Sequence, residues 1–136
     1  MKPPDDQTRR RLVGQWFDKA ETDLQATESL LSRNPPLLYP SCFFSQQAAE
    51  KYLKGFLTWN QVDFPKTHDL KELLDLAEPV NSNLVSSLQD AIVLTRYSVE
   101  VRYPGDMPEP TVAEAQEALR LAQFVREAIL AALDLK

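Results

Sequence analysis

The stretch SCFFSQQAAEKYLKGFLTWN, residues 41–60, decides the fold of this chain. Apolar and small side chains recur in it at spacings of three and four residues, which is the repeat of one face of an α-helix. That face carries Cys42, Ser45, Ala49, Tyr52, Leu53, Phe56 and Trp59. The other face carries Gln47, Glu50 and Lys54, so the stretch predicts a helix with two distinct faces. Ser41 has the side chain of an N-cap, and we place the helix start there.

The segment before this stretch predicts a second amphipathic helix. Apolar side chains recur every three to four residues over residues 12–31, and Asn34-Pro35-Pro36 ends the pattern. Residues 1–10 are polar, contain two prolines and show no periodicity, so we expect a flexible N-terminal arm there.

The segment after the stretch contains two capping-box spacings. Asp69 with Glu72, and Thr111 with Glu114, each place an acidic side chain three residues after a capping residue. Another helix is expected to begin near Asn83, although its end is poorly marked. The expected helices therefore cover residues 12–31, 41–60, 70–77, 83–95 and 112–133.

Long helices joined by short loops pack antiparallel. The pattern therefore predicts an all-α fold, an up-and-down antiparallel four-helix bundle in which the short helix over residues 70–77 is an accessory. Residues 11–136 are expected to form one domain, because no repeat, low-complexity tract or second pattern interrupts them.

Composition excludes several classes of function. The net charge of −5 argues against an extensive nucleic-acid surface. One cysteine, Cys42, cannot form an internal disulfide, and one Cys with one His cannot supply a zinc site. No apolar run approaches membrane-spanning length. We therefore expect a cytoplasmic protein without a cofactor.

Three ordered motifs carry a resemblance to a known family. They are CFFSQQAAEKYLKGFL over residues 42–57, PKTHDL over residues 65–70 followed by Leu73-Leu74, and Arg102-Tyr103-Pro104. Together they resemble the HEPN family, whose name abbreviates "higher eukaryotes and prokaryotes nucleotide-binding". The resemblance covers roughly residues 12–133. It implies a helical bundle that is usually a homodimer, often encoded beside a minimal nucleotidyltransferase as half of a toxin–antitoxin-like pair.

Many HEPN proteins are metal-independent ribonucleases that carry an Arg, four to six intervening residues and then a His. This chain departs from that motif. At those distances Arg96 is followed by Val101, Arg102 and Tyr103, and Arg102 by Met107, Pro108 and Glu109. The only histidine, His68, has no Arg at the matching upstream positions. The resemblance thus implies the non-ribonuclease branch, acting as a nucleotide-binding or interaction module. The alternative is a ribonuclease with a non-standard site, in which carboxylates such as Glu50, Asp69 or Asp106 replace the histidine.

The best candidates for a ligand site are Arg96, Arg102 and Tyr103. Two guanidiniums and a ring beside the stiff Pro104-Gly105 loop suit a phosphate and a base. Ordinary salt bridges are the competing interpretation, with partners Glu100, Asp106 or Glu109.

A second set of candidates lies on or near the central helix. Lys54 and His68 are possible further ligand contacts, with Gln47 and Glu50 beside them. Each also has a structural interpretation. Glu50 and Lys54 have the i, i+4 order of a helix-stabilising pair, and His68 could cap the next helix or pack under its loop. Gln46 and Gln47 could read a base edge or bond a neighbouring helix end.

Overall fold

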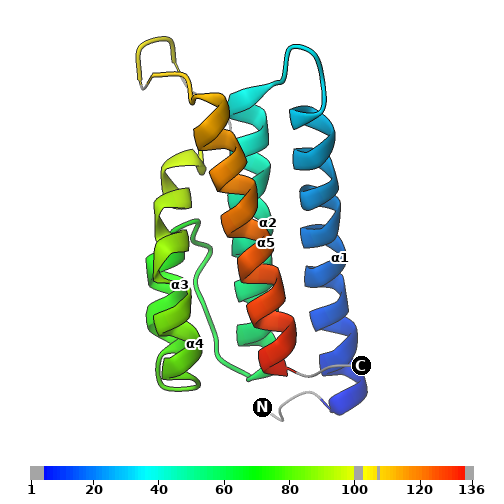
Figure 1. Ribbon diagram of the computed structural model, residues 1–136. Helices are drawn as coiled ribbons and strands as arrows, with labels where there is room; N and C mark the ends of the chain where they lie inside the picture. Colours follow the sequence, from blue (N-terminus) through cyan, green and yellow to red (C-terminus); the bar gives the residue numbers. More distant parts are fainter. Residues whose placement is uncertain (1–4, 100–102, 107, 134–136) are drawn as a thin grey trace.

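The computed structural model describes residues 5–99, 103–106 and 108–133 (Figure 1). All regular elements in these residues are helical, which confirms the predicted all-α bundle. None of the described helices is long and apolar enough to cross a membrane. The elements are α1 (Asp6–Leu31), α2 (Leu38–Trp59), α3 (Leu70–Ala77), α4 (Ser82–Ser87), the 3-10 helix η1 (Gln89–Tyr97) and α5 (Val112–Leu133).

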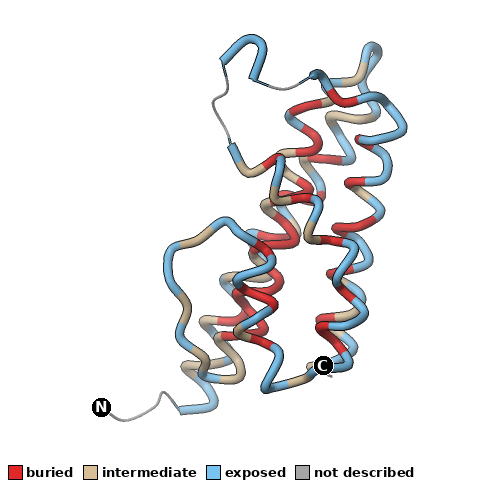
Figure 2. The backbone as a smooth tube through the Cα atoms, turned by 90° about the vertical axis from the view of Figure 1, so that its left-hand side faces the viewer, coloured by how far each residue is buried: buried red, intermediate tan, exposed pale blue. Residues whose placement is uncertain are grey.

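Helix α2 is the centre of the bundle. It packs against α1, α5, η1 and α3, whereas α1 contacts only α2 and α5 among the described elements. Figure 1 shows α1 on one side of the α2–α5 pair and the α3, α4 and η1 group on the other. The buried residues line the inner surfaces of these elements in Figure 2. A helix with neighbours on several sides has little solvent-facing surface. Polar side chains on α2 therefore need hydrogen-bond partners within the protein.

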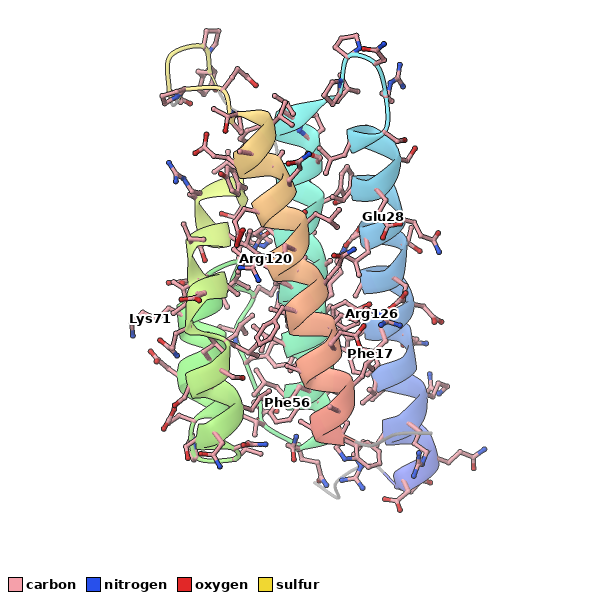
Figure 3. All side chains as sticks on the ribbon, viewed as in Figure 1. Phe17, Glu28, Phe56, Lys71, Arg120 and Arg126 are labelled. Carbon is pink, nitrogen blue, oxygen red and sulfur yellow. The ribbon has the colours of Figure 1, made fainter. Side chains whose placement is uncertain are left out.

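The close approach of α1 and α2 depends on Gly55. A Cβ atom at this position would lie 2.5 Å from Cε1 of Phe17. The Phe17 ring also packs 5.5 Å from the ring of Tyr52, measured between centroids. In Figure 3 Phe17 lies between α1 and α5. The glycine is therefore required by helix packing.

Helix α1 begins earlier than the sequence pattern indicated. Asp5 is its N-cap, accepting a hydrogen bond of 2.7 Å from the Thr8 amide. The Arg9 guanidinium lies 4.1 Å from the centroid of the Trp59 ring and donates to the Trp59 carbonyl. The prediction of a flexible arm is thus wrong for residues 6–10, because this contact with the end of α2 holds them. The rest of the expected arm, residues 1–4, lies outside the described residues.

The start of α2 also differs from the prediction. The helix begins at Leu38, and Pro40 stands in its first turn, where the missing N–H is tolerated. Ser41 is buried, and its hydroxyl donates to the Leu38 carbonyl at 2.7 Å. Ser41 is therefore not the N-cap, because the helix has already begun three residues before it.

The two predicted capping boxes have different outcomes. Thr111 and Glu114 bond each other's main-chain amides reciprocally at 2.9 and 3.0 Å, which confirms that box. Asp69 is confirmed as the N-cap of α3, accepting from the Lys71 amide at 3.0 Å. Glu72 does not complete its box, because its carboxylate accepts from the Thr67 hydroxyl instead.

The expected helix over residues 83–95 is divided into two pieces. Helix α4 starts from an Asn81 cap and ends at Ser87, and a 3-10 helix follows it. A 3-10 helix has three residues per turn, so every third side chain lies on one line. The buried side chains on this segment have that spacing: Leu88, Ala91, Leu94 and Tyr97. The burial pattern therefore follows the three-residue repeat.

Candidate functional site

A buried carboxylate organises a polar cluster on α2. Glu50 is only 3% exposed. Its Oε2 accepts a hydrogen bond of 2.9 Å from the Lys54 ammonium, one turn further along the helix. Its Oε1 lies 2.9 Å from Nδ1 of His68 and accepts from the Gln46 amide at 3.1 Å. Three donors therefore converge on one carboxylate.

Two glutamines extend the cluster and attach it to the main chain. The Gln46 amide also donates to the His68 carbonyl at 3.0 Å. Gln47 donates to the Gln46 side-chain oxygen at 2.7 Å. Gln46 is fully buried, and Gln47 is half-buried. His68 is thus held to α2 by both its ring and its main chain.

The loop between α2 and α3 explains why this polar face is buried. Phe64 in the loop packs edge-on against Trp16 of α1, with 6.0 Å between ring centroids. The Lys54 ammonium lies 5.8 Å from each of these two ring centroids. The sequence placed Glu50 and Lys54 on the polar face of this helix, and the loop and α1 cover that face. Their i, i+4 pairing is confirmed, although the pair is buried.

The surroundings of Glu50 keep it ionised. Burial raises the pKa of a carboxyl, but the hydrogen bonds from Lys54, His68 and Gln46 outweigh this effect and hold the pKa of Glu50 below its ordinary value. Because an ionised carboxylate can only accept hydrogen bonds, the proton between Glu50 and His68 belongs to Nδ1. The neutral ring then has an unprotonated Nε2.

His68 is the solvent-facing member of the cluster. Its side chain is 64% exposed. Within the part of the chain that the structure describes, Nε2 makes no hydrogen bond. The cluster therefore presents one oriented ring nitrogen to solvent.

Acidification should weaken the fold through Glu50. A carboxyl with a depressed folded-state pKa contributes stability that is fully present above its unfolded-state pKa, near 4.5, and is lost as pH falls through the folded-state value. We expect the free energy of unfolding, measured with urea from pH 7 to pH 3, to fall less in a Glu50→Gln variant than in the parent. Asp23 shifts in the opposite direction, since burial raises its pKa. An equal pH dependence in parent and variant would contradict the assignment.

Arg96 lies in different surroundings from this cluster. Its guanidinium is 5.6 Å from the centroid of the Tyr97 ring. It borders a groove of about 270 Å³ between η1 and α5. Apolar walls come from both elements, and Glu114 and Glu117 of α5 also line the groove. No hydrogen bond or ion pair between described residues joins Arg96 to the Glu50 cluster, so the structure separates the predicted site residues into two groups.

Tyr103 is 73% exposed and belongs to a turn. Its amide donates to the Asp106 carboxylate at 2.8 Å, and the Asp106 amide donates back to its carbonyl at 3.1 Å. Gly105 has a φ of 88°, a conformation that glycine adopts at little cost. Arg102 and Glu100 lie outside the described residues, so their predicted roles stay predictions.

Each carboxylate of the alternative ribonuclease site already accepts a hydrogen bond from another residue. Glu50 bonds Lys54 and His68, Asp69 caps α3, and Asp106 closes its turn. The pKa of Glu50 is lowered, whereas a general acid at neutral pH needs a raised one. No three metal-ligating side chains gather among the described residues.

Three members of the site make contacts that the sequence did not predict. Trp16 and Phe64 form the aromatic wall around the Lys54 ammonium, and Gln46 links the loop to α2. Gln46 lies four residues before Glu50, and this i, i+4 spacing was the one available signal. The aromatic contact joins distant segments and left no local pattern.

Comparison with known proteins identifies the family. The HEPN domain model matches residues 13–132. The chain resembles the crystal structure of TT1696 from Thermus thermophilus, with 28% sequence identity, a TM-score of 0.68, and coverage of 86% of this chain and 94% of that one. It shares the fold of ST0689, an archaeal HEPN homologue, with 24% identity, a TM-score of 0.62, and coverage of 86% and 97%. No curated protein matches the chain. Because the family model spans nearly the whole sequence, this chain belongs to the HEPN domain family.

Proposed function

We propose that this HEPN chain is a non-catalytic module that binds a nucleotide and acts with a minimal nucleotidyltransferase in a toxin–antitoxin-like pair. The absence of any Arg followed by a His after four to six residues supports the non-catalytic part. The pairing rests on the family resemblance. The observation that carries nucleotide binding is the position of Arg96 beside an apolar groove.

The groove between η1 and α5 has suitable chemistry for a nucleotide. Its apolar walls suit a base, while the Arg96 guanidinium offers two parallel donors to a phosphate. The carboxylates of Glu114 and Glu117 on α5 would repel an anion in the groove, but each accepts a hydrogen bond from another residue. Glu114 accepts from the Thr111 amide, and Glu117 accepts from Arg120. The Arg120 guanidinium offsets the charge of Glu117, whereas Glu114 remains ionised. Tyr103 is the proposed further contact.

Substitution of Arg96 tests this proposal. We expect Arg96→Ala to weaken nucleotide binding about ten- to hundredfold, because a charged hydrogen bond to phosphate contributes about 1.5–3 kcal/mol. Arg96→Lys should rescue binding only in part, since an ammonium keeps the charge and loses the fork. Isothermal titration with ATP, GTP and UTP measures the affinities.

Arg11→Ala is the matched control for this experiment. Arg11 is an exposed residue near the start of α1, and Figure 1 shows α1 on the other side of the α2–α5 pair from η1. Its removal changes the net charge by the same amount as Arg96→Ala. Affinity that falls equally in both variants would indicate only a long-range charge effect. Affinity that is unchanged in Arg96→Ala would place the site elsewhere.

The same face is our proposed surface for homodimer formation. Val93 on η1 and Val112 and Phe124 on α5 are large apolar side chains that are 46–49% exposed. Phe124 lies seven residues after Glu117, which lines the groove, so the two share one side of α5. Light scattering on the titration samples reports whether this chain is a dimer.

A further inference from the structure

The Glu50–His68 pair does not take part in the proposed nucleotide groove, and its geometry calls for its own explanation. It combines a nearly fully buried carboxylate with a largely exposed imidazole, 2.9 Å apart. Packing of the loop requires only that the loop be held against α2. The Gln46 bond to the His68 main-chain carbonyl already contributes to that. What the pair adds is a fixed tautomer and a fixed direction for Nε2.

We propose that Nε2 of His68 is a phosphoryl-acceptor site. A nucleophilic side chain is activated when a hydrogen-bonding partner orients it and stabilises the charge that develops during attack. Here Glu50 accepts the Nδ1 proton, so the lone pair resides on Nε2, which faces solvent. No other group has to remove a proton from the ring before Nε2 attacks phosphorus.

The charged groups around the ring are mixed, and one exposed cation can offset part of the charge of a phosphoryl group. From α2, Glu50 is compensated by the buried Lys54 ammonium. Within the loop, Lys66 is an exposed cation two residues before His68, whereas the Lys71 ammonium of α3 is paired with Asp75 at 2.9 Å. Asp69 and Glu72 are opposing charges, and their carboxylates accept from the Lys71 amide and the Thr67 hydroxyl.

The transfer step balances within this arrangement. The Nε2 lone pair forms the N–P bond, and the bond from phosphorus to the donor's leaving group breaks, with the leaving group taking the electron pair. The ring becomes a positively charged phosphoimidazole that keeps its Nδ1 proton. Glu50 stabilises that positive charge through the existing hydrogen bond. No oxidant or metal is needed, and the donor is a phosphoramidate or another activated phosphoryl compound.

The tautomer can be read directly in the parent protein. Because His68 is the only histidine, a long-range ¹H–¹⁵N spectrum contains one imidazole signal set. We expect protonated Nδ1 and unprotonated Nε2 in the neutral ring. A neutral ring protonated mainly on Nε2 would overturn the proposal without any substitution.

Reactivity is tested with potassium phosphoramidate, followed by intact mass and ³¹P NMR. We expect one phosphoryl group, on Nε2, added at least about tenfold faster than to Nα-acetylhistidine. This rate increase is well below the ~10⁴-fold effect on kcat that an orienting aspartate has in a full catalytic triad. His68→Gln should take up none. Reaction at the rate of the free amino acid, or on Nδ1, would overturn the proposal.

Two further variants separate this site from other effects. Glu50→Gln, checked for folding by circular dichroism, should react at the rate of the free amino acid because it lacks the negative charge. A folded Glu50→Gln variant that reacts like the parent would also overturn the proposal. Arg96→Ala should react like the parent, so failure of the nucleotide groove and failure of the acceptor site are distinguishable.

Discussion

Replacing Glu50 with leucine is expected to lower the free energy of unfolding at neutral pH by about 3–5 kcal/mol. The substitution leaves the Lys54 ammonium buried, with the rings of Trp16 and Phe64 nearby and no counterion. An uncompensated buried charge costs far more than the pair contributes. The change also removes the acceptor of the His68 ring. Urea unfolding followed by circular dichroism measures the loss.

A second substitution shows whether the cost comes from the unpaired charge. Glu50→Leu combined with Lys54→Met should recover most of the lost stability, because apolar replacement of a buried pair is often neutral. The exposed pair Lys71–Asp75 is the matched control, since it has the same i, i+4 spacing and the same 2.9 Å separation. Figure 3 shows Lys71 pointing away from the bundle. Asp75→Leu should change stability by less than about 1 kcal/mol. Equal losses in Glu50→Leu and Asp75→Leu would mean that solvent screens both pairs.

Local signals were sufficient for much of the fold. The Thr111–Glu114 box involves residues three apart, and its geometry depends only on the helix that it begins. The apolar stripes on the long helices were equally readable. The start of α1 was missed because the contact of Arg9 with Trp59 joins residues fifty apart in the chain. Sequence periodicity carries no information about such a contact.

The candidate site was predicted by residue type but not by arrangement. Glu50, Lys54, Gln47 and His68 were named as candidates, and the structure brings them into one cluster. Their burial was not predicted, because a helical wheel shows only the two faces of α2 and not the loop that closes over one of them. Lys54 and His68 were predicted as further contacts of the ligand site at Arg96, yet Arg96 lines the groove beside α5. A wheel cannot show which neighbouring element a side chain meets.

The 3-10 helix is a case in which a signal was present and was read with the wrong repeat. Its buried side chains lie at intervals of three residues from Leu88 to Tyr97. The α-helical repeat instead places Ile92 and Thr95 on the same face as Leu88 and Ala91. Thr95 instead accepts a hydrogen bond of 3.1 Å from the Leu70 amide and joins η1 to the start of α3. Arg96 follows Thr95 directly and lies beside α5, where it lines the groove.

The purified protein is expected to leave single-stranded RNA intact in the presence of EDTA. In the metal-independent ribonucleases of this family an Arg and a His act together, and losing the proton-transferring imidazole should lower the cleavage rate on the order of hundredfold or more. This chain has one imidazole, and its Nδ1 is bound to Glu50. Among the described residues no arginine hydrogen-bonds or pairs with it.

A fluorescent RNA assay with three proteins makes this expectation decisive. The parent is compared with His68→Gln and Arg102→Ala, so that cleavage by a contaminant, which both variants would retain, is recognised. Robust digestion by the parent that either variant abolishes would establish a non-standard ribonuclease site and refute the non-catalytic proposal. Intact RNA with all three proteins, together with nucleotide binding that depends on Arg96, would separate binding from catalysis. The phosphoryl-acceptor test is independent of this result, because it uses Nε2 as a nucleophile toward phosphorus and not as a base toward a ribose hydroxyl.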